Sequence, residues 1–93
     1  MISNYQLMMV EEEIGKAEAK HGLLSIDLMD SLSVLAEEFG EVAHCIRDMR
    51  EGDTTSETRD LLYEELAQVA AVCFRMMQSM EDGAYVKPLV GMS

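Results

Sequence analysis

Apolar residues recur along this chain at alternating steps of three and four positions, the spacing of an amphipathic α-helix. The first run predicts a helix over residues 3–20. Its apolar positions are Leu7, Val10, Ile14 and Ala17. Lys20, His21 and Gly22 follow in the order typical of a helix C-terminus, because basic side chains favour the last turn and glycine readily adopts a positive φ.

Two further runs of the same spacing predict a second and a third helix. The second helix begins between Ser25 and Ser31 and ends near Arg50, and the third ends before Gly83. The apolar stripe of the second helix is Leu35, Phe39, Val42, Ile46 and Met49. The stripe of the third helix is Leu62, Leu66, Val69, Cys73, Met76 and Met80.

Helix-capping residues mark both ends of the connection between the second and third helices. Gly52 fits the C-terminal cap of the second helix, and Thr54 with Glu57 fits a capping box that opens the third. A connection of about five residues makes these two helices antiparallel neighbours. We therefore expect an all-α fold, a three-helix antiparallel chain in one domain over residues 1–83. Residues 84–93 show no period and are expected to form a flexible tail or to pack on a partner.

The second and third helices are apolar over a wider face than a single stripe. The additional positions are Ala36, Ala43, Ala70, Ala71, Val72 and Met77. A chain of 93 residues buries only a modest fraction of its surface on its own. We therefore expect two copies of this helical hairpin to complete a four-helix-bundle core, in a homodimer or homotetramer.

Charge narrows the range of partners. Eighteen acidic residues against seven basic ones give a net charge of −11, which argues against binding a nucleic-acid polymer or an anionic membrane.

The sequence has no run of about 18 apolar residues that would span a membrane, and its start lacks the pattern of a signal peptide. Cys45 and Cys73 lack CxxC spacing and lie within apolar helical patterns, so we expect buried free thiols and a cytoplasmic protein.

Paired oxygen-bearing side chains stand beside the apolar stripes of the second and third helices. Glu38 and Glu41 are three residues apart, and so are Glu65 and Gln68. Residues at this spacing share a helix face, so three carboxylates converge if the two faces meet, and a hard divalent cation would relieve their repulsion. Gly40 lies between the first two acids at a cost of about 1 kcal/mol relative to alanine. Close helix approach, tight packing or room for a ligand would each explain it.

The spacing of these residues resembles a known family signature. Glu37-Glu38-x-x-Glu41, 23 further residues and then Glu65-x-x-Gln68 are similar to the EExxE and ExxD motifs of the MazG-like, all-α nucleoside triphosphate pyrophosphohydrolases. The chain departs from the pattern at Gln68, where the family has aspartate. A glutamine carbonyl can still ligate a hard cation, but it carries no charge, so the affinity for metal should be lower.

The resemblance covers residues 10–80 and implies an activity, a cofactor and a set of site residues. The activity is Mg²⁺-dependent hydrolysis of a nucleoside triphosphate to the monophosphate and pyrophosphate, with Mn²⁺ as a substitute metal. Glu37 would act as general base or as a partner of the metal ligands. The metal ligands would be Glu38, Glu41, Glu65 and, more weakly, Gln68. Candidate phosphate contacts are Lys16, Arg47, Arg50 and Arg75.

Other interpretations of the same residues stay open. Solvated surface acids would need no metal at all. Glu41 and His44 form an ExxH which, doubled in a dimer and joined by two copies of Glu65, matches the ligands of a di-iron or di-manganese bundle. A non-enzymatic interaction module could use methionines of the third helix, such as Met76 and Met77, as an adaptable surface. A P-loop NTPase is excluded because the chain has no GxxxxGK[ST] motif.

Overall fold

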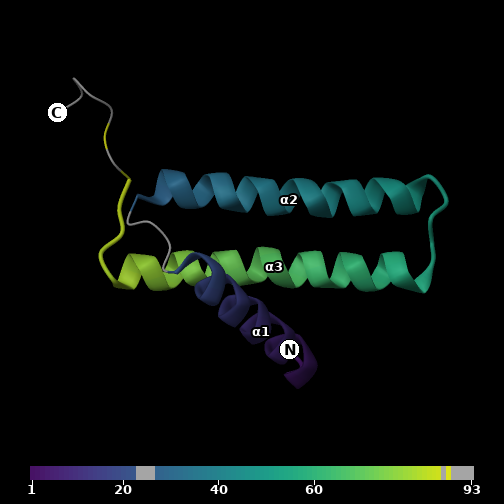
Figure 1. Cartoon of the computed structure of the whole chain (residues 1–93), viewed down its shortest axis with the longest axis horizontal. Coiled ribbons are helices and arrows are strands. Elements are labelled where there is room, and N and C mark those ends of the chain that lie inside the picture. The colour runs from purple at the N-terminus through teal and green to yellow at the C-terminus, as the bar shows by residue number, and fades with distance from the viewer. Residues whose placement is uncertain (23–26, 87, 89–93) are drawn as a thin grey trace.

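Three α-helices account for most of the molecule in the computed structural model, which describes residues 1–22, 27–86 and 88 (Figure 1). They are α1 (Asn4–His21), α2 (Leu28–Arg50) and α3 (Ser56–Glu81). The described residues contain no strand beyond a single isolated bridge. The predicted all-α class is therefore confirmed, and each helix lies where its apolar stripe placed it.

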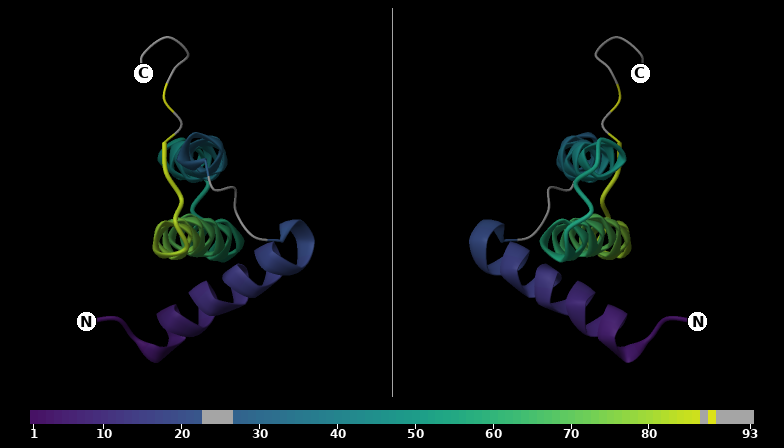
Figure 2. Two further views of the ribbon diagram at one scale, coloured as in Figure 1. Left: turned by 90° about the vertical axis from the view of Figure 1, so that its left-hand side faces the viewer. Right: turned by 90° about the vertical axis from the view of Figure 1, so that its right-hand side faces the viewer.

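The three helices do not form a regular antiparallel bundle. α2 and α3 run antiparallel as a long hairpin, whereas α1 crosses α3 obliquely (Figure 1). Seen along the hairpin, α1 lies on the side of α3 that faces away from α2 (Figure 2). Close backbone contacts accordingly join α2 with α3 and α1 with α3. The antiparallel prediction therefore holds for the hairpin, and α1 departs from it because its stripe packs on α3 alone.

Small side chains allow α3 to pack between the other two helices. Ala67 and Ala71, four residues apart, are 5% and 2% exposed. Val72 completes the buried apolar set on α3, and Val42 with Cys45 supplies the α2 side. Large stripe residues remain outside this core: the exposed fractions are 64% for Phe39, 51% for Ile46 and 48% for Leu66. The single chain thus buries only part of each predicted stripe.

The C-terminal end of α1 is tied to α3. Gly22 caps the helix with a φ of 71°, as the sequence predicts, and its N–H donates to the carbonyl of Glu18 at 2.8 Å. Arg75 of α3 is buried, and its Nη2 donates to the carbonyl of Gly22. This hydrogen bond links residues far apart in the sequence and fixes where α1 ends. At the end of α2, Glu51 is the cap, and Gly52 follows it with a φ of 113°, so the prediction that Gly52 is the cap is wrong by one residue.

The cap of α3 differs from the predicted one. Thr55 is the N-cap, and its Oγ1 accepts a hydrogen bond from the backbone N–H of Thr58 at 3.2 Å. The hydroxyls of both threonines donate to Asp53 Oδ1, at 3.2 and 2.8 Å. These bonds hold the helix start one residue beyond Thr54, so the prediction of a Thr54–Glu57 capping box is wrong.

Backbone pairing also ties the segment after α3 to the start of α2. The N–H of Leu28 donates to the carbonyl of Tyr85 at 2.9 Å. Of the predicted tail 84–93, residues 87 and 89–93 lie outside the described residues. None of the helices described here combines the length and apolar character needed to cross a lipid bilayer.

The two cysteines are free thiols in different environments. Cys45 is buried between α2 and α3, as predicted, whereas Cys73 is exposed. The prediction of a second buried thiol is wrong because Cys73 lies on the stripe of α3 that the single chain leaves uncovered.

Candidate metal centre

Three glutamates meet across the α2–α3 hairpin. Glu38 and Glu41 come from α2 and Glu65 from α3, and each offers a carboxylate oxygen within 4.8 Å of the others. Glu38 and Glu65 are half-buried and Glu41 is exposed, so the group lies at the edge of the core and is open to solvent. The helical spacing puts Glu38 and Glu41 on one side of α2, and the packing of the hairpin brings that side against Glu65 of α3.

Gln68 joins these glutamates one turn along α3 from Glu65. With its side-chain amide oriented to satisfy hydrogen bonding, Nε2 donates to Glu38 Oε2 at 2.8 Å and to Glu65 Oε2 at 3.0 Å. A half-turn of the amide would exchange Nε2 for the carbonyl oxygen at the same place. Gln68 can therefore link the carboxylates without a cation and present an oxygen to a cation among them.

The electrostatics of this group favour the uptake of positive charge. Burial, a hydrogen bond to Glu41 and the charges of Glu41, Glu38 and Glu64 raise the pKa of Glu65 from 4.5 to about 7. Burial and the neighbouring glutamates, Glu41 foremost, raise the pKa of Glu38 as well. Glu65 therefore holds a proton at pH values up to about 7, and a divalent cation can replace that proton.

The structure places the other predicted site residues outside this group. Glu37 is exposed on α2, beside Glu38 but not among the three converging glutamates. His44 is also exposed: its Nδ1 lies 2.7 Å from Arg47 Nη2, and its Nε2 lies 3.5 Å from Asp48 Oδ2. His44 does not converge with Glu41, so the single chain does not assemble the ExxH arrangement.

A cleft of about 320 Å³ adjoins the glutamates on the α1 side. All three helices line it, including Glu13, Lys16 and Lys20 of α1, Glu38 of α2, and Gln68 and Arg75 of α3. Lys16 and Arg75 are two of the four predicted phosphate contacts. The other two, Arg47 and Arg50, lie towards the far end of α2 and do not line this cleft.

Glu13 is the residue of this region that sequence reasoning missed. It is only 7% exposed, and its charge contributes to the raised pKa of Glu38. Its Oε1 lies 3.3 Å from Lys16 Nζ. The signal for it was its position three residues after Val10 and four before Ala17, which places it on the packed face of α1.

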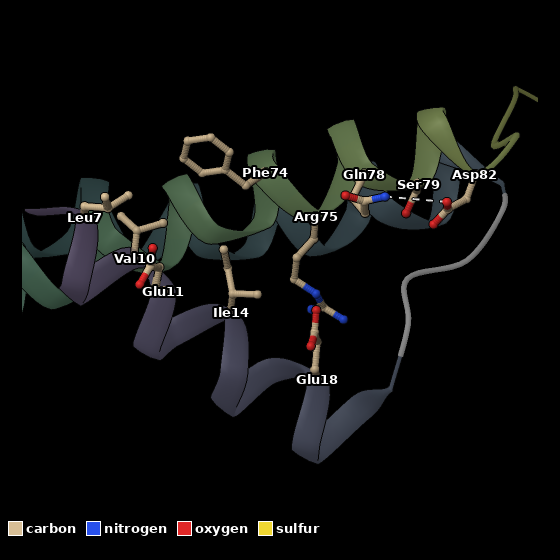
Figure 3. Close-up of a pocket in the computed structure, with 10 residues that line it drawn as sticks. All are labelled: Leu7, Val10, Glu11, Ile14, Glu18, Phe74, Arg75, Gln78, Ser79 and Asp82. Carbon is tan, nitrogen blue, oxygen red and sulfur yellow. Dashed lines mark hydrogen bonds between the residues drawn. The ribbon is translucent and has the colours of Figure 1, made fainter. Parts of the chain in front are cut away.

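A second cleft lies elsewhere on α1, and it is separate from the three converging glutamates. It measures about 390 Å³ and runs between α1 and the C-terminal half of α3, from Leu7 and Phe74 to Asp82 (Figure 3). Arg75 points from α3 towards Glu18 of α1 within it (Figure 3). None of the three converging glutamates lines this cleft, so it is not the natural place for metal chemistry.

Gly40 stands in open space. A Cβ built at this position would meet no other atom within 4 Å. Tight packing within the single chain therefore does not explain the glycine, which leaves room for a ligand or close approach of another helix.

Comparisons with the models of known protein families, with curated proteins and with solved structures found no match. The similarity to the MazG-like signature thus rests on the residues themselves.

Proposed function

We propose that this chain is a Mg²⁺-dependent nucleoside triphosphate pyrophosphohydrolase of the MazG-like type. The observation that carries the proposal is the convergence of Glu38, Glu41 and Glu65 at the edge of a cleft that also contains basic side chains. Carboxylate oxygens are the ligands that Mg²⁺ and Mn²⁺ prefer. A chain with a net charge of −11 has no electrostatic attraction for a triphosphate unless positive charge is gathered locally.

The donor set fits a hard divalent cation. Glu38, Glu41 and Glu65 would hold it, with the Gln68 carbonyl as a neutral fourth ligand after its amide turns. When bound, such a cation neutralises charge on phosphate oxygens and makes water a better nucleophile at neutral pH. Holding the cation would also offset the repulsion among the glutamates, which adds to burial in raising the pKa of Glu38 and that of Glu65.

Glu37 is assigned the role of general base. It is solvent-exposed on α2 beside Glu38, so it can accept the proton that an attacking water loses. In the reaction a water oxygen bonds to the α-phosphorus while the bond from that phosphorus to the α–β bridging oxygen breaks. Pyrophosphate leaves with the bond electrons, and the nucleoside monophosphate remains.

Self-association is part of the proposal. Phe39, Ile46 and Leu66 are about half to two-thirds exposed in the single chain, and they belong to the stripes of the hairpin. Pairing two hairpins over these stripes, in a homodimer or homotetramer, would complete a four-helix core. The two free thiols fit the reducing conditions of the cytoplasm, where nucleotide pools are found.

A second candidate function is a helical interaction module without catalysis. It is favoured by the exposure of Met77 and Met80, at 58% and 59%, because flexible thioether side chains adapt to different partners. This candidate predicts no turnover of any nucleotide.

Pyrophosphate release from a panel of canonical and modified NTPs and dNTPs, with Mg²⁺, tests the proposal. We expect release from at least one nucleotide, and its loss in Glu38→Ala. Absence of release across the panel from a folded, metal-supplied protein would instead support the interaction module.

A further inference from the structure

Positive charge is concentrated in one place on this acidic chain. The protein has seven lysine and arginine residues against eighteen acidic ones. Three of those seven, Lys16, Lys20 and Arg75, line the cleft beside the glutamates, together with His21. Because Glu13 and Glu38 also line the cleft, its attraction for an anion depends on the basic side chains that outnumber these two carboxylates.

The walls of the cleft suit a phosphate chain better than a nucleobase. Its apolar part consists of small or branched aliphatic side chains, Ala17, Val34, Ala71 and Val72. The described residues that line it include no phenylalanine, tyrosine or tryptophan, and the imidazole of His21 is the aromatic ring among them. Its volume of about 320 Å³ is at the small end for ligand pockets. Because Glu38 and Gln68 form one wall, a chain of phosphates lying in it would reach the converging glutamates.

The three cations differ in how free they are to bind. Arg75 is buried and donates to the carbonyl of Gly22, which ties it to the packing of α1. The side chain of Lys16 is 66% exposed, while that of its ion-pair partner Glu13 is 8% exposed. The buried carboxylate therefore holds the ammonium group at the mouth of the cleft, and an ammonium group has three donors. Lys16 is therefore the lysine of the cleft that a buried partner holds in place, whereas Lys20 is exposed near the end of α1.

We propose that this cleft binds the β- and γ-phosphates of the substrate, which leave as pyrophosphate, and that Lys16 is their principal contact on α1. The assignment rests on the proposed function, because that reaction defines these phosphates as the leaving group. It adds a binding role for α1, a helix that supplies none of the converging glutamates.

Calorimetric titration with inorganic pyrophosphate in the presence of Mg²⁺ tests this assignment without requiring turnover. The proteins compared are the wild type, Lys16→Met and Arg59→Met. Arg59 is an exposed residue of α3 that lines none of the clefts described above, so its substitution matches the loss of one positive charge. Titration with a nucleoside monophosphate, which lacks these phosphates, supplies the reference ligand.

We expect pyrophosphate to bind Lys16→Met about tenfold more weakly than the wild type, and Arg59→Met within about twofold of it. Binding of the monophosphate should change little in either variant. Equal weakening by Lys16→Met and Arg59→Met would overturn the assignment, and so would a wild type that binds no pyrophosphate. Weakening confined to Lys16→Met in a protein that hydrolyses no nucleotide would uphold the cleft as a polyphosphate site and refute the proposed function. Lys16→Gln repeats the comparison with a polar side chain, and circular dichroism checks that each variant is helical.

Discussion

Glu65 of α3 shares a hydrogen bond with Glu41 of α2, and that contact adds to the burial that raises the pKa of Glu65 to about 7. Two carboxyl groups can make this bond only when one of them carries a proton. At neutral pH Glu65 is therefore close to the midpoint of its titration, where a cation can take the place of its proton. Because of this proton, the stability of the protein should depend on pH in a way that reports on the candidate metal centre.

The free energy of unfolding should fall as the pH rises from about 4.5 to about 7. Below that window Glu65 is protonated in both states. Within it the folded protein holds a proton that the unfolded chain has lost, so raising the pH favours unfolding. A rise in pKa from 4.5 to about 7 corresponds to about 3 kcal/mol of unfolding free energy for a fully enclosed carboxyl group. Because Glu65 is only half-buried, we expect the free energy of unfolding to fall by about 1–2 kcal/mol.

Urea unfolding followed by circular dichroism across this pH range measures that slope. Glu65→Gln should flatten the curve and stabilise the protein near pH 8, whereas Glu64→Gln, at the neighbouring position, should leave most of the slope in place. Millimolar Mg²⁺ should restore stability near pH 8, because a bound cation replaces the missing proton. A wild-type curve with no decline between these pH values would contradict the account of the pair.

Gln68→Asp should lower the stability of the metal-free protein and raise its affinity for metal. The substitution removes the hydrogen bonds from the amide to Glu38 and Glu65 and adds a fourth negative charge. We expect the metal-free protein to lose about 1–2 kcal/mol and the affinity for Mn²⁺ to rise about tenfold. Calorimetry with Mn²⁺ and thermal unfolding in a chelator give the two quantities. Gln78→Asp places the same change elsewhere on α3; an equal gain in affinity there would show that general charge is responsible.

The two neighbouring threonines before α3 should differ in importance. Thr55 accepts a hydrogen bond from the backbone of Thr58, so Thr55→Ala should cost about 1 kcal/mol of stability. Thr54→Ala should change the free energy of unfolding by less than about 0.5 kcal/mol, because Thr54 is not the cap. Chemical denaturation of both variants compares them. A larger loss of stability in Thr54→Ala than in Thr55→Ala would instead support the Thr54–Glu57 capping box that the sequence pattern suggested.

The helices and the convergence of the glutamates could be predicted because both depend on local periodicity. A period of 3.6 residues puts Glu38 and Glu41 on one face, and a short connection turns that face towards Glu65. The oblique course of α1 could not be predicted in this way. It depends on packing against α3 and on the bond from Arg75 to Gly22, which joins residues remote in sequence.

The pattern places a residue on a helix face but does not show whether a neighbouring helix buries it. Glu13 is buried because α1 packs its face against α3, and its pairing with Lys16 compensates the buried charge. Ala67 and Ala71 form the centre of the core, while the larger stripe residue Phe39 stays exposed. A stripe of large apolar residues shows which face of a helix is apolar, but not which neighbour covers it.

Titration of Mn²⁺ into the protein, followed by electron paramagnetic resonance at neutral pH, tests the central claim most directly. The wild type, Glu38→Gln and Glu37→Gln should be compared, because these glutamates are adjacent on α2 and only Glu38 belongs to the converging group. We predict saturable binding to the wild type, affinity within about threefold in Glu37→Gln, and weakening of at least about tenfold in Glu38→Gln. No saturable binding to the wild type, or equal affinity in all three proteins, would contradict the assignment of this group as a metal centre.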